Sequence, residues 1–159
     1  MKTVIYPGTF DPITNGHIDI LKKASRVFDQ VILSVAEDTG KSTLFSVDER
    51  EQICREAVRD IANVQVMKFS GLVVNFARKV NAIAMIRGLR AISDFEYELS
   101  QALMNEKLSD RFSTIFFVPD YKYLYLSSSM IKQVISLGGS INNLLPPGVE
   151  EALRKKLNL

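Results

Sequence analysis

Near its N-terminus the chain reads Thr3-Val4-Ile5-Tyr6-Pro7-Gly8-Thr9-Phe10-Asp11-Pro12-Ile13-Thr14-Asn15-Gly16-His17. The apolar, β-branched start of this stretch is typical of a buried strand, and apolar residues at helical spacing follow its end. The loop between them has neither the G-x-G-x-x-G fingerprint of dinucleotide-binding proteins nor the G-K-[ST] of a P-loop. Its glycines and the free N–H groups of a helix N-terminus are still suited to an anion. The stretch therefore predicts a strand, an anion-binding loop and a helix.

The same alternation continues along the chain. Apolar runs rich in β-branched residues occupy residues 3–6, 31–36, 64–69, 82–87 and 114–119. Most are continuous, as expected of strands that are covered on both faces. Helical patterns separate them, and this order requires right-handed crossovers and a parallel sheet. The sequence thus predicts one α/β domain over residues 1–159, Rossmann-like, with an open five-stranded parallel sheet and helices on both faces. Ligands of such sheets bind beyond the carboxyl ends of the strands, where the strand order reverses.

The helical patterns also predict which side chains face the core. The apolar stripes comprise Ile20, Leu21, Ala24, Val27 and Phe28; Leu72, Val73, Phe76, Ala77 and Val80; Phe95, Leu99, Ala102 and Leu103; and Met130, Ile131, Val134 and Ile135. The third of these helices should open at Ser93, whose spacing to Glu96 is that of a capping box. A last helix should follow Gly148, with acidic residues early and basic residues late, as the helix dipole favours.

Composition excludes several classes of protein. The chain has 159 residues, 47% of them hydrophobic, and 20 basic against 18 acidic side chains, for a net charge of +2. This mild charge, without a basic run, indicates no nucleic-acid or membrane surface. The N-terminal apolar stretch is too short for a signal peptide, and no segment approaches the roughly twenty apolar residues that span a bilayer. We expect a cytoplasmic protein.

His17 is the only histidine, and it lies in the first turn of the predicted helix. A structural role is the usual one for an isolated histidine. Its position behind Gly16, at a helix N-terminus on the ligand-binding edge, favours a functional role instead. The positive end of the helix dipole disfavours a protonated ring. We expect a neutral imidazole that donates a hydrogen bond to a phosphate.

Three further segments carry groups that suit phosphates. Arg87 and Arg90 flank Gly88 where the fourth strand ends, and the arginine fork suits bidentate phosphate contacts. The serines at 127–129 head a helix, with Lys132 one turn later; one hydroxyl is needed as an N-cap and the others exceed that need. Lys41 follows the second strand, and its ammonium group could supply a positive charge. Considered alone, Lys41 would be expected to be a solvent-exposed surface residue.

No metal cage or covalent nucleophile is apparent. One histidine and one cysteine cannot form a zinc site. Asp11, Asp94 and Asp120 could each hold magnesium through water, and nothing singles one out. Positive charge, N–H groups and hydroxyls around phosphates are sufficient for phosphoryl-group chemistry, which can proceed by positioning and charge stabilisation alone.

The segment 6–17, with Thr14-Asn15-Gly16-His17, resembles the [HT]-x-G-H signature of the nucleotidyltransferase superfamily. Together with segments 85–90, 94–98 and 127–129, it resembles the bacterial phosphopantetheine adenylyltransferase family over the whole chain. The resemblance implies a nucleotidyltransferase fold and AMP transfer from ATP to 4′-phosphopantetheine, giving dephospho-coenzyme A and pyrophosphate, with magnesium as cofactor. It also implies a homohexamer.

The resemblance assigns a role to each matching position. It implies that His17 stabilises the transition state and that Lys41 is catalytic. The implied ATP contacts are Thr9, Phe10, His17, Gly88, Leu89, Arg90, Glu98, Tyr123, Leu124, Tyr125, Leu126, Ser127, Ser128 and Ser129. The implied contacts to phosphopantetheine are Thr9, Lys41, Val73 and Arg87. The signature leaves open a different acceptor, such as nicotinamide mononucleotide, and a non-catalytic module that senses adenylates.

Overall fold

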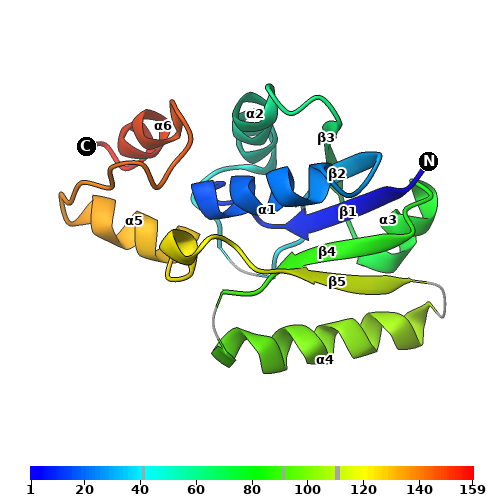
Figure 1. Cartoon of the computed structure of the whole chain (residues 1–159). Helices are drawn as coiled ribbons and strands as arrows, with labels where there is room; N and C mark the ends of the chain where they lie inside the picture. Colours follow the sequence, from blue (N-terminus) through cyan, green and yellow to red (C-terminus); the bar gives the residue numbers. More distant parts are fainter. Residues whose placement is uncertain (41, 91, 110–111) are drawn as a thin grey trace.

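The computed structural model describes residues 1–40, 42–90, 92–109 and 112–159. Strands and helices alternate from the N-terminus, and two helices complete the chain (Figure 1). The elements are β1 (Thr3–Gly8), α1 (Asn15–Ser25), β2 (Gln30–Ala36), α2 (Val47–Val58), β3 (Val64–Phe69), α3 (Val73–Lys79), β4 (Ala84–Gly88), α4 (Ile92–Leu108), β5 (Ser113–Phe117), the 3-10 helix η1 (Tyr121–Tyr123), α5 (Ser128–Ser136) and α6 (Val149–Lys156). The five predicted strands are confirmed, with ends that differ by at most two residues.

The sheet is parallel throughout and has the order β3-β2-β1-β4-β5. From the central strand β1, the chain adds β2 and then β3 on one side of the sheet. It then returns to the other side of β1, where it adds β4 and then β5. The carboxyl ends of β1 and β4 lie side by side at this reversal. This is the crevice in which α/β sheets bind ligands, and it is formed by the loop quoted at the start of the chain.

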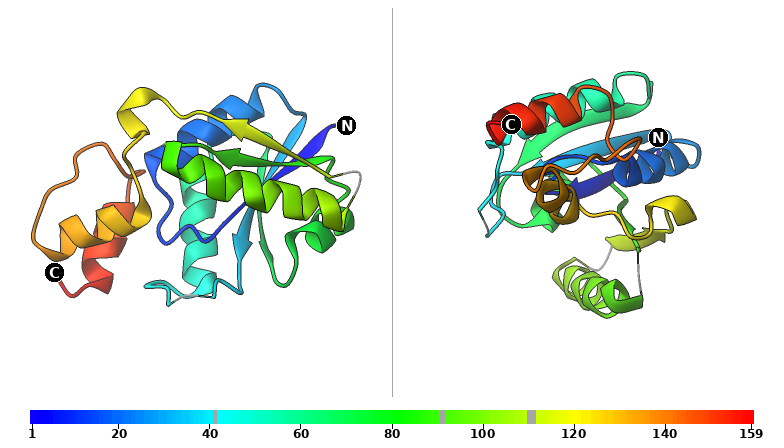
Figure 2. Two further views of the ribbon diagram at one scale, coloured as in Figure 1. Left: turned by 90° about the horizontal axis from the view of Figure 1, so that it is seen from below. Right: turned by 90° about the vertical axis from the view of Figure 1, so that its left-hand side faces the viewer.

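Helices cover both faces of the sheet, as predicted (Figures 1 and 2). The alternation of side chains along the strands decides which face each residue joins. Val4 and Tyr6 of β1 belong to the larger core cluster, with α1 and α2. Ile5, between them, belongs to the smaller cluster on the opposite face, with Phe76 of α3. The predicted α/β fold is thus confirmed.

Outside α4, three residues predicted for the core are exposed: Val27, Leu72 and Met130, which is 40% exposed in the first turn of α5. Val27 is 62% exposed because α1 ends at Ser25 and the helical spacing stops before Val27. Leu72 is 55% exposed because it is the N-cap of α3 and precedes the face that packs on the sheet.

For α4, the predicted start of the helix and the predicted burial of its apolar stripe are both wrong. The helix begins at Ile92, one residue before the predicted start. Its apolar stripe is covered only in part: Phe95, Leu99 and Leu103 are 43%, 38% and 58% exposed. The reason is that α4 packs beside the edge strand β5, where Phe95 contacts Phe116 with ring centroids 6.2 Å apart. An edge strand covers only part of a long helix.

The two C-terminal helices pack on the larger core cluster, beyond the carboxyl ends of the strands (Figure 1). Ser127 caps α5 by accepting a hydrogen bond from the N–H of Met130 at 3.1 Å. Gly148, with φ +79°, precedes α6, which has the acidic first turn and basic last turn predicted for it. In the described residues, no helix is both long and apolar enough to cross a bilayer.

Candidate active site

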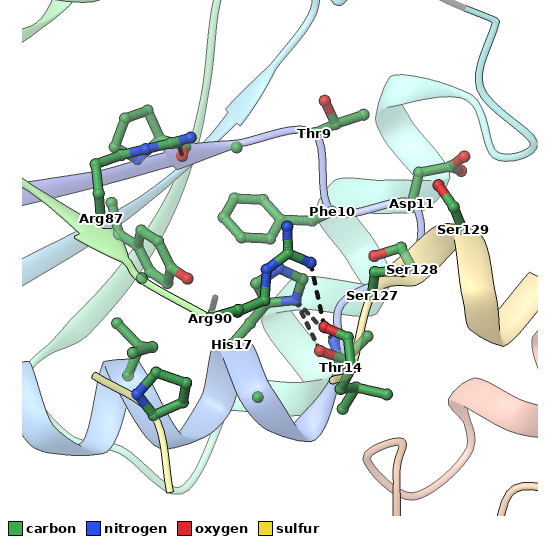
Figure 3. A pocket seen from close by; sticks show the side chains of 18 of the residues that line it. Thr9, Phe10, Asp11, Thr14, His17, Arg87, Arg90, Ser127, Ser128 and Ser129 are labelled. Carbon is green, nitrogen blue, oxygen red and sulfur yellow. Dashed lines mark hydrogen bonds between the residues drawn. The ribbon is translucent and has the colours of Figure 1, made fainter. Parts of the chain in front are cut away.

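A cavity of about 580 Å³ lies at the reversal of the strand order (Figure 3). Loops after β1 and β4 and the N-termini of α1 and α5 form its walls. Twelve of the residues predicted for the site line this cavity: Thr9, Phe10, His17, Arg87, Gly88, Arg90, Glu98, Tyr123, Leu126, Ser127, Ser128 and Ser129. Segments separated by more than a hundred residues are therefore brought together as predicted.

Four predicted residues do not line the cavity, and one lies outside the described residues. The N–H of Leu89 donates to the carbonyl of Phe117 at 2.9 Å, so Leu89 extends the β4–β5 pairing. Val73 opens α3 and packs against the smaller core cluster. Leu124 and Tyr125 are exposed around the end of η1. Lys41 is the residue that the structure does not describe.

His17 is held by its own helix N-terminus. Its Nδ1 accepts a hydrogen bond from the N–H of Thr14 at 3.0 Å and lies 3.1 Å from the Thr14 hydroxyl (Figure 3). His17 thus occupies the place of the glutamate in a capping box. Because Nδ1 is an acceptor, the ring proton of the neutral imidazole is on Nε2. His17 therefore has an N–H donor on the side of the ring away from Thr14, in a residue that lines the cavity.

The imidazole is neutral, as predicted. Partial burial of the ring, with the positive charges of Arg90 and Arg87, lowers the pKa of His17 from its ordinary 6.5 to about 3. The aromatic ring of Phe10 covers part of the imidazole, with its centroid 5.1 Å from that of His17 in an edge-on arrangement. A neutral donor needs no counter-charge and stays a donor at physiological pH.

We expect the single histidine of the folded chain to show no titration between about pH 5 and 8. The proton NMR resonance of its Cε1–H measures this directly. A lowered pKa in the folded state also means that the unfolded chain binds the proton more readily, so the free energy of unfolding should fall as the pH falls from 6.5 toward 3. His17→Gln should flatten this part of the stability curve. A resonance that titrates near pH 6.5 would contradict the lowered pKa and the neutral ring.

Arg87 is fixed by an acidic partner. Its Nε and Nη2 donate to the two oxygens of Glu98 at 2.7 and 2.5 Å, and its Nη1 donates to the carbonyl of Pro7 at 2.9 Å. Such a bidentate pair sets the orientation of the guanidinium. Burial would lower the pKa of Arg87, but the hydrogen bonds and charge of Glu98 raise it. Arg87 therefore presents a permanent, oriented charge, and Glu98 acts through it.

Arg90 connects two walls of the cavity. Its Nη1 donates to the carbonyl of Leu126 at 3.1 Å, which joins the loop after β4 to the serine segment. In that segment Ser127 is the helix cap, and the hydroxyl of Ser128 donates to the carbonyl of Pro12 at 2.8 Å. Ser129 lines the cavity beside them.

Asp11 and Lys132 form an ion pair across the cavity floor, 2.5 Å apart. Asp11 also accepts hydrogen bonds from the N–H groups of Leu44 and Phe45, both at 2.9 Å. Burial raises the pKa of Asp11, but the hydrogen bond from Lys132 and the two N–H groups together lower it. The pair ties the loop after β1 to α5 and to the segment before α2.

Sequence reasoning missed Tyr6, Tyr97 and Arg50. Tyr6 and Tyr97 line the cavity, and burial raises the pKa of the Tyr6 hydroxyl. Tyr6 was assigned only to a strand, and a helical pattern cannot show that Tyr97 turns to a cavity. Arg50 contacts the loop after β1 from a helix forty-one residues later, and no local pattern indicates such a contact.

Gly8 is constrained by the ring of Phe10. A Cβ atom at Gly8 would lie 2.7 Å from Cζ of Phe10 and 3.0 Å from its Cε2. The ring is buried against Tyr6 and His17 and has little room to move. We expect Gly8→Ala to lower the free energy of unfolding by about 1–3 kcal/mol, as overpacked cores do. Denaturant titration measures this, and the Cε1–H resonance of His17 should shift. A variant as stable as the wild type would contradict the contact.

Comparisons with known proteins agree with this geometry. Residues 5–134 match the family described as cytidylyltransferase-like. A phosphopantetheine adenylyltransferase of Moorella thermoacetica is 53% identical over 156 residues, 98% of this chain and 98% of that protein. One of Dictyoglomus turgidum is 48% identical over 159 residues, 100% of this chain and 99% of that protein.

A solved structure from Vibrio parahaemolyticus, assigned as a nicotinate-nucleotide adenylyltransferase, superposes with a TM-score of 0.75 over 99% of this chain and 95% of that one. At 19% identity it shows a common fold. The identities of about one half extend over 98% and 100% of this chain. The chain therefore belongs to the phosphopantetheine adenylyltransferase family, among the cytidylyltransferase-like proteins.

Proposed function

We propose that this chain transfers the adenylyl group of ATP to 4′-phosphopantetheine and releases dephospho-coenzyme A and pyrophosphate. The observation that carries the proposal is the neutral His17, whose Nδ1 is occupied by Thr14 and whose Nε2–H is a donor at the cavity. The arginines around it supply the positive charge that two phosphate-bearing substrates require. Family membership supports phosphopantetheine as the acceptor.

The chemistry needs no covalent intermediate. An oxygen of the acceptor phosphate attacks the α-phosphorus of ATP and forms a new P–O bond. The bond from the α-phosphorus to the oxygen that bridges to the β-phosphate breaks, and its electrons leave with pyrophosphate. The acceptor phosphate is already ionised at neutral pH, so no general base is required. The Nε2–H of His17 meets the charge that develops on the α-phosphoryl oxygens.

The cavity divides between the two substrates in this proposal. Arg90, with Gly88 and the serines at 127–129, lies toward the phosphates of ATP. Arg87, oriented by Glu98, lies toward the acceptor. Thr9 and Phe10 lie between them, on the loop after β1. Lys41 remains part of the proposal as a catalytic cation and a contact to the acceptor.

We propose that magnesium enters with ATP as part of the substrate. Among the described residues, no three His, Cys, Asp or Glu side chains gather as a metal site. The two described carboxylates that line the cavity are engaged, Asp11 by Lys132 and Glu98 by Arg87. Magnesium commonly keeps water and substrate phosphates as ligands, so it needs no protein cage and neutralises charge on the pyrophosphate.

The aspartates considered as magnesium ligands do not support a protein-held ion. Asp11 already accepts three hydrogen bonds, which makes it a structural clamp. Asp120 does not line the cavity and caps η1 by accepting from the N–H of Lys122. The side chain of Asp94 lies outside the described part of the chain.

Pyrophosphate release with a panel of acceptors tests the function. We expect release with ATP, magnesium and 4′-phosphopantetheine, and none when nicotinamide mononucleotide replaces the acceptor. Release with nicotinamide mononucleotide alone would assign a different acceptor. Binding of ATP without release, for every acceptor, would identify an adenylate-binding module instead of an enzyme.

We also propose that residues 1–159 act as one cytoplasmic domain and assemble as a homohexamer. The exposed apolar side chains of α4 support assembly, since Leu103 and Met104 are each more than half exposed. Several exposed large apolar side chains on one helix are typical of a protein–protein contact. Sedimentation should give six times the mass of the chain, and a monomer would contradict the proposed assembly.

A further inference from the structure

Arg50 is a charged side chain in the interior of the molecule. It projects from α2, is 2% exposed and does not line the cavity. Its Nη1 donates to the carbonyls of Thr9 at 2.7 Å and Ala36 at 2.8 Å, and its Nε donates to that of Phe45 at 3.3 Å. Across the described residues, Arg50 has no carboxylate partner. Buried charges are usually paired with an opposite charge. The burial of a guanidinium whose hydrogen bonds go to backbone carbonyls therefore calls for a physical explanation.

The bond to Thr9 fixes one peptide group. A trans peptide is planar, and its C=O and N–H point in opposite directions. Because the carbonyl of Thr9 points at Arg50, the N–H of Phe10 points away from Arg50. Thr9 and Phe10 both line the cavity, whereas Arg50 lies behind them. The arginine thus sets the direction of a backbone donor at the cavity wall.

That donor lacks a partner within the described parts of the chain. The N–H of Phe10 makes no hydrogen bond to those residues, although Phe10 is only 4% exposed. More than nine in ten buried backbone N–H groups are satisfied. Phe10 also has φ +50°, an unfavourable conformation for a residue with a side chain, so surrounding contacts must hold it. Arg50 behind the peptide and His17 against the ring supply such contacts.

We propose that Arg50 is a positioning residue, which holds the Thr9 carbonyl so that the N–H of Phe10 donates to a phosphate oxygen of a bound substrate. Backbone N–H groups that are fixed in advance are effective phosphate donors because no reorganisation is needed on binding. The inference rests on the proposed function only in requiring a phosphate in the cavity, from ATP or from the acceptor.

The direct test observes the Phe10 amide in the wild-type protein. The protein is labelled with ¹⁵N-phenylalanine, and Phe10→Leu assigns its resonance among the nine phenylalanines. MgATP and 4′-phosphopantetheine are added separately, and calorimetry on the same samples establishes occupancy. We expect one ligand to move the Phe10 amide proton downfield and to slow its exchange roughly tenfold or more. The ligand that does so identifies the phosphate.

The outcomes separate the two proposals. Binding that leaves the Phe10 amide unchanged for both ligands overturns the role of Arg50 and leaves the proposed function standing. Absence of binding for both ligands contradicts the proposed function, and the inference falls with it. These measurements do not depend on the folding of any Arg50 variant.

Variants then link the amide to Arg50. Arg50→Met removes all three carbonyl contacts, and we expect kcat/KM to fall roughly 10²-fold, as misplacement of a binding group does. The ligand-induced shift of Phe10 should disappear. Arg50→Lys keeps one donor toward Thr9. It should recover part of kcat/KM and part of the ligand-induced shift of the Phe10 amide. If only Arg50→Lys folds, an intermediate loss of both signals is the expected result.

Arg154→Met is the matched control. Arg154 also donates to a backbone carbonyl, that of Gly139 at 3.1 Å, but lies on α6 and away from the cavity. Arg154→Met should keep the ligand-induced shift of the Phe10 amide and the wild-type kcat/KM. An Arg50 variant that behaves like Arg154→Met, with the Phe10 shift intact, would show that Arg50 serves folding alone.

Discussion

Replacing His17 with alanine is expected to lower kcat by roughly 10²–10³-fold, the usual loss when one transition-state donor is removed. The Nε2–H of the neutral ring meets charge that develops on the α-phosphoryl group only during the reaction. Interactions of this kind raise kcat without tightening ground-state binding. Calorimetry without acceptor should therefore find nearly unchanged affinity for ATP. Steady-state pyrophosphate release gives kcat.

His17→Gln separates the chemical role from the structural one. Glutamine is a normal capping-box residue and can still accept the N–H of Thr14, but it lacks the ring donor. We expect it to restore the thermal midpoint that His17→Ala lowers slightly, while kcat stays low. If either variant turned over normally but melted far earlier, His17 would be a structural histidine.

Arg90→Ala and Arg87→Ala are expected to weaken different substrates. Arg90 should contact the ATP phosphates, and its removal should raise the KM for ATP roughly 10- to 100-fold, the equivalent of one charge-assisted hydrogen bond. Arg87 should contact the acceptor, and its removal should raise the KM for phosphopantetheine by a similar factor. The two KM values are measured by varying each substrate at saturating levels of the other.

Glu98→Gln serves as the graded control for this pair. It keeps the size of the side chain but weakens the two bonds that orient Arg87. We expect a smaller rise in the KM for phosphopantetheine and little change for ATP. If the two arginine variants raised the same KM by the same factor, the division of the cavity between the substrates would be wrong.

The sheet and its switch point could be predicted because their determinants are local. A strand covered on both faces needs a continuous apolar run, and each of the five runs became a strand. Parallel pairing follows from the alternation with helices, and the binding edge follows from parallel pairing. The place of His17 at the cavity could be predicted for the same reason, since its position is defined by the loop and helix immediately around it.

The partners that hold the site could not be predicted, because each joins segments far apart in sequence. From the sequence, Arg50 is a polar residue of a predicted helix, and only the folded chain brings it into contact with the carbonyl of Thr9. Lys132 and Asp11 meet across 121 positions. Glu98 is predicted as an ATP contact, and its ion pair with Arg87 is a second feature that the sequence does not reveal.

The errors on α4 have a different physical origin. An apolar stripe predicts that a helix face is covered, but it does not say by what. The pattern of Leu99 and Leu103 predicts a core face, but the sheet does not cover it. Such a stripe on a helix beside an edge strand fits a contact with another molecule, which the sequence of one chain cannot distinguish from its own core.

The most direct test of adenylyl transfer is ³¹P NMR of the wild-type protein with MgATP and 4′-phosphopantetheine. Attack at the α-phosphorus predicts that the monoester signal of the acceptor disappears as the two diphosphate signals of dephospho-coenzyme A and the single signal of pyrophosphate grow together. The appearance of ADP with a diphosphorylated acceptor would place the attack at the γ-phosphorus. That result would contradict the role given to His17 and the proposed reaction.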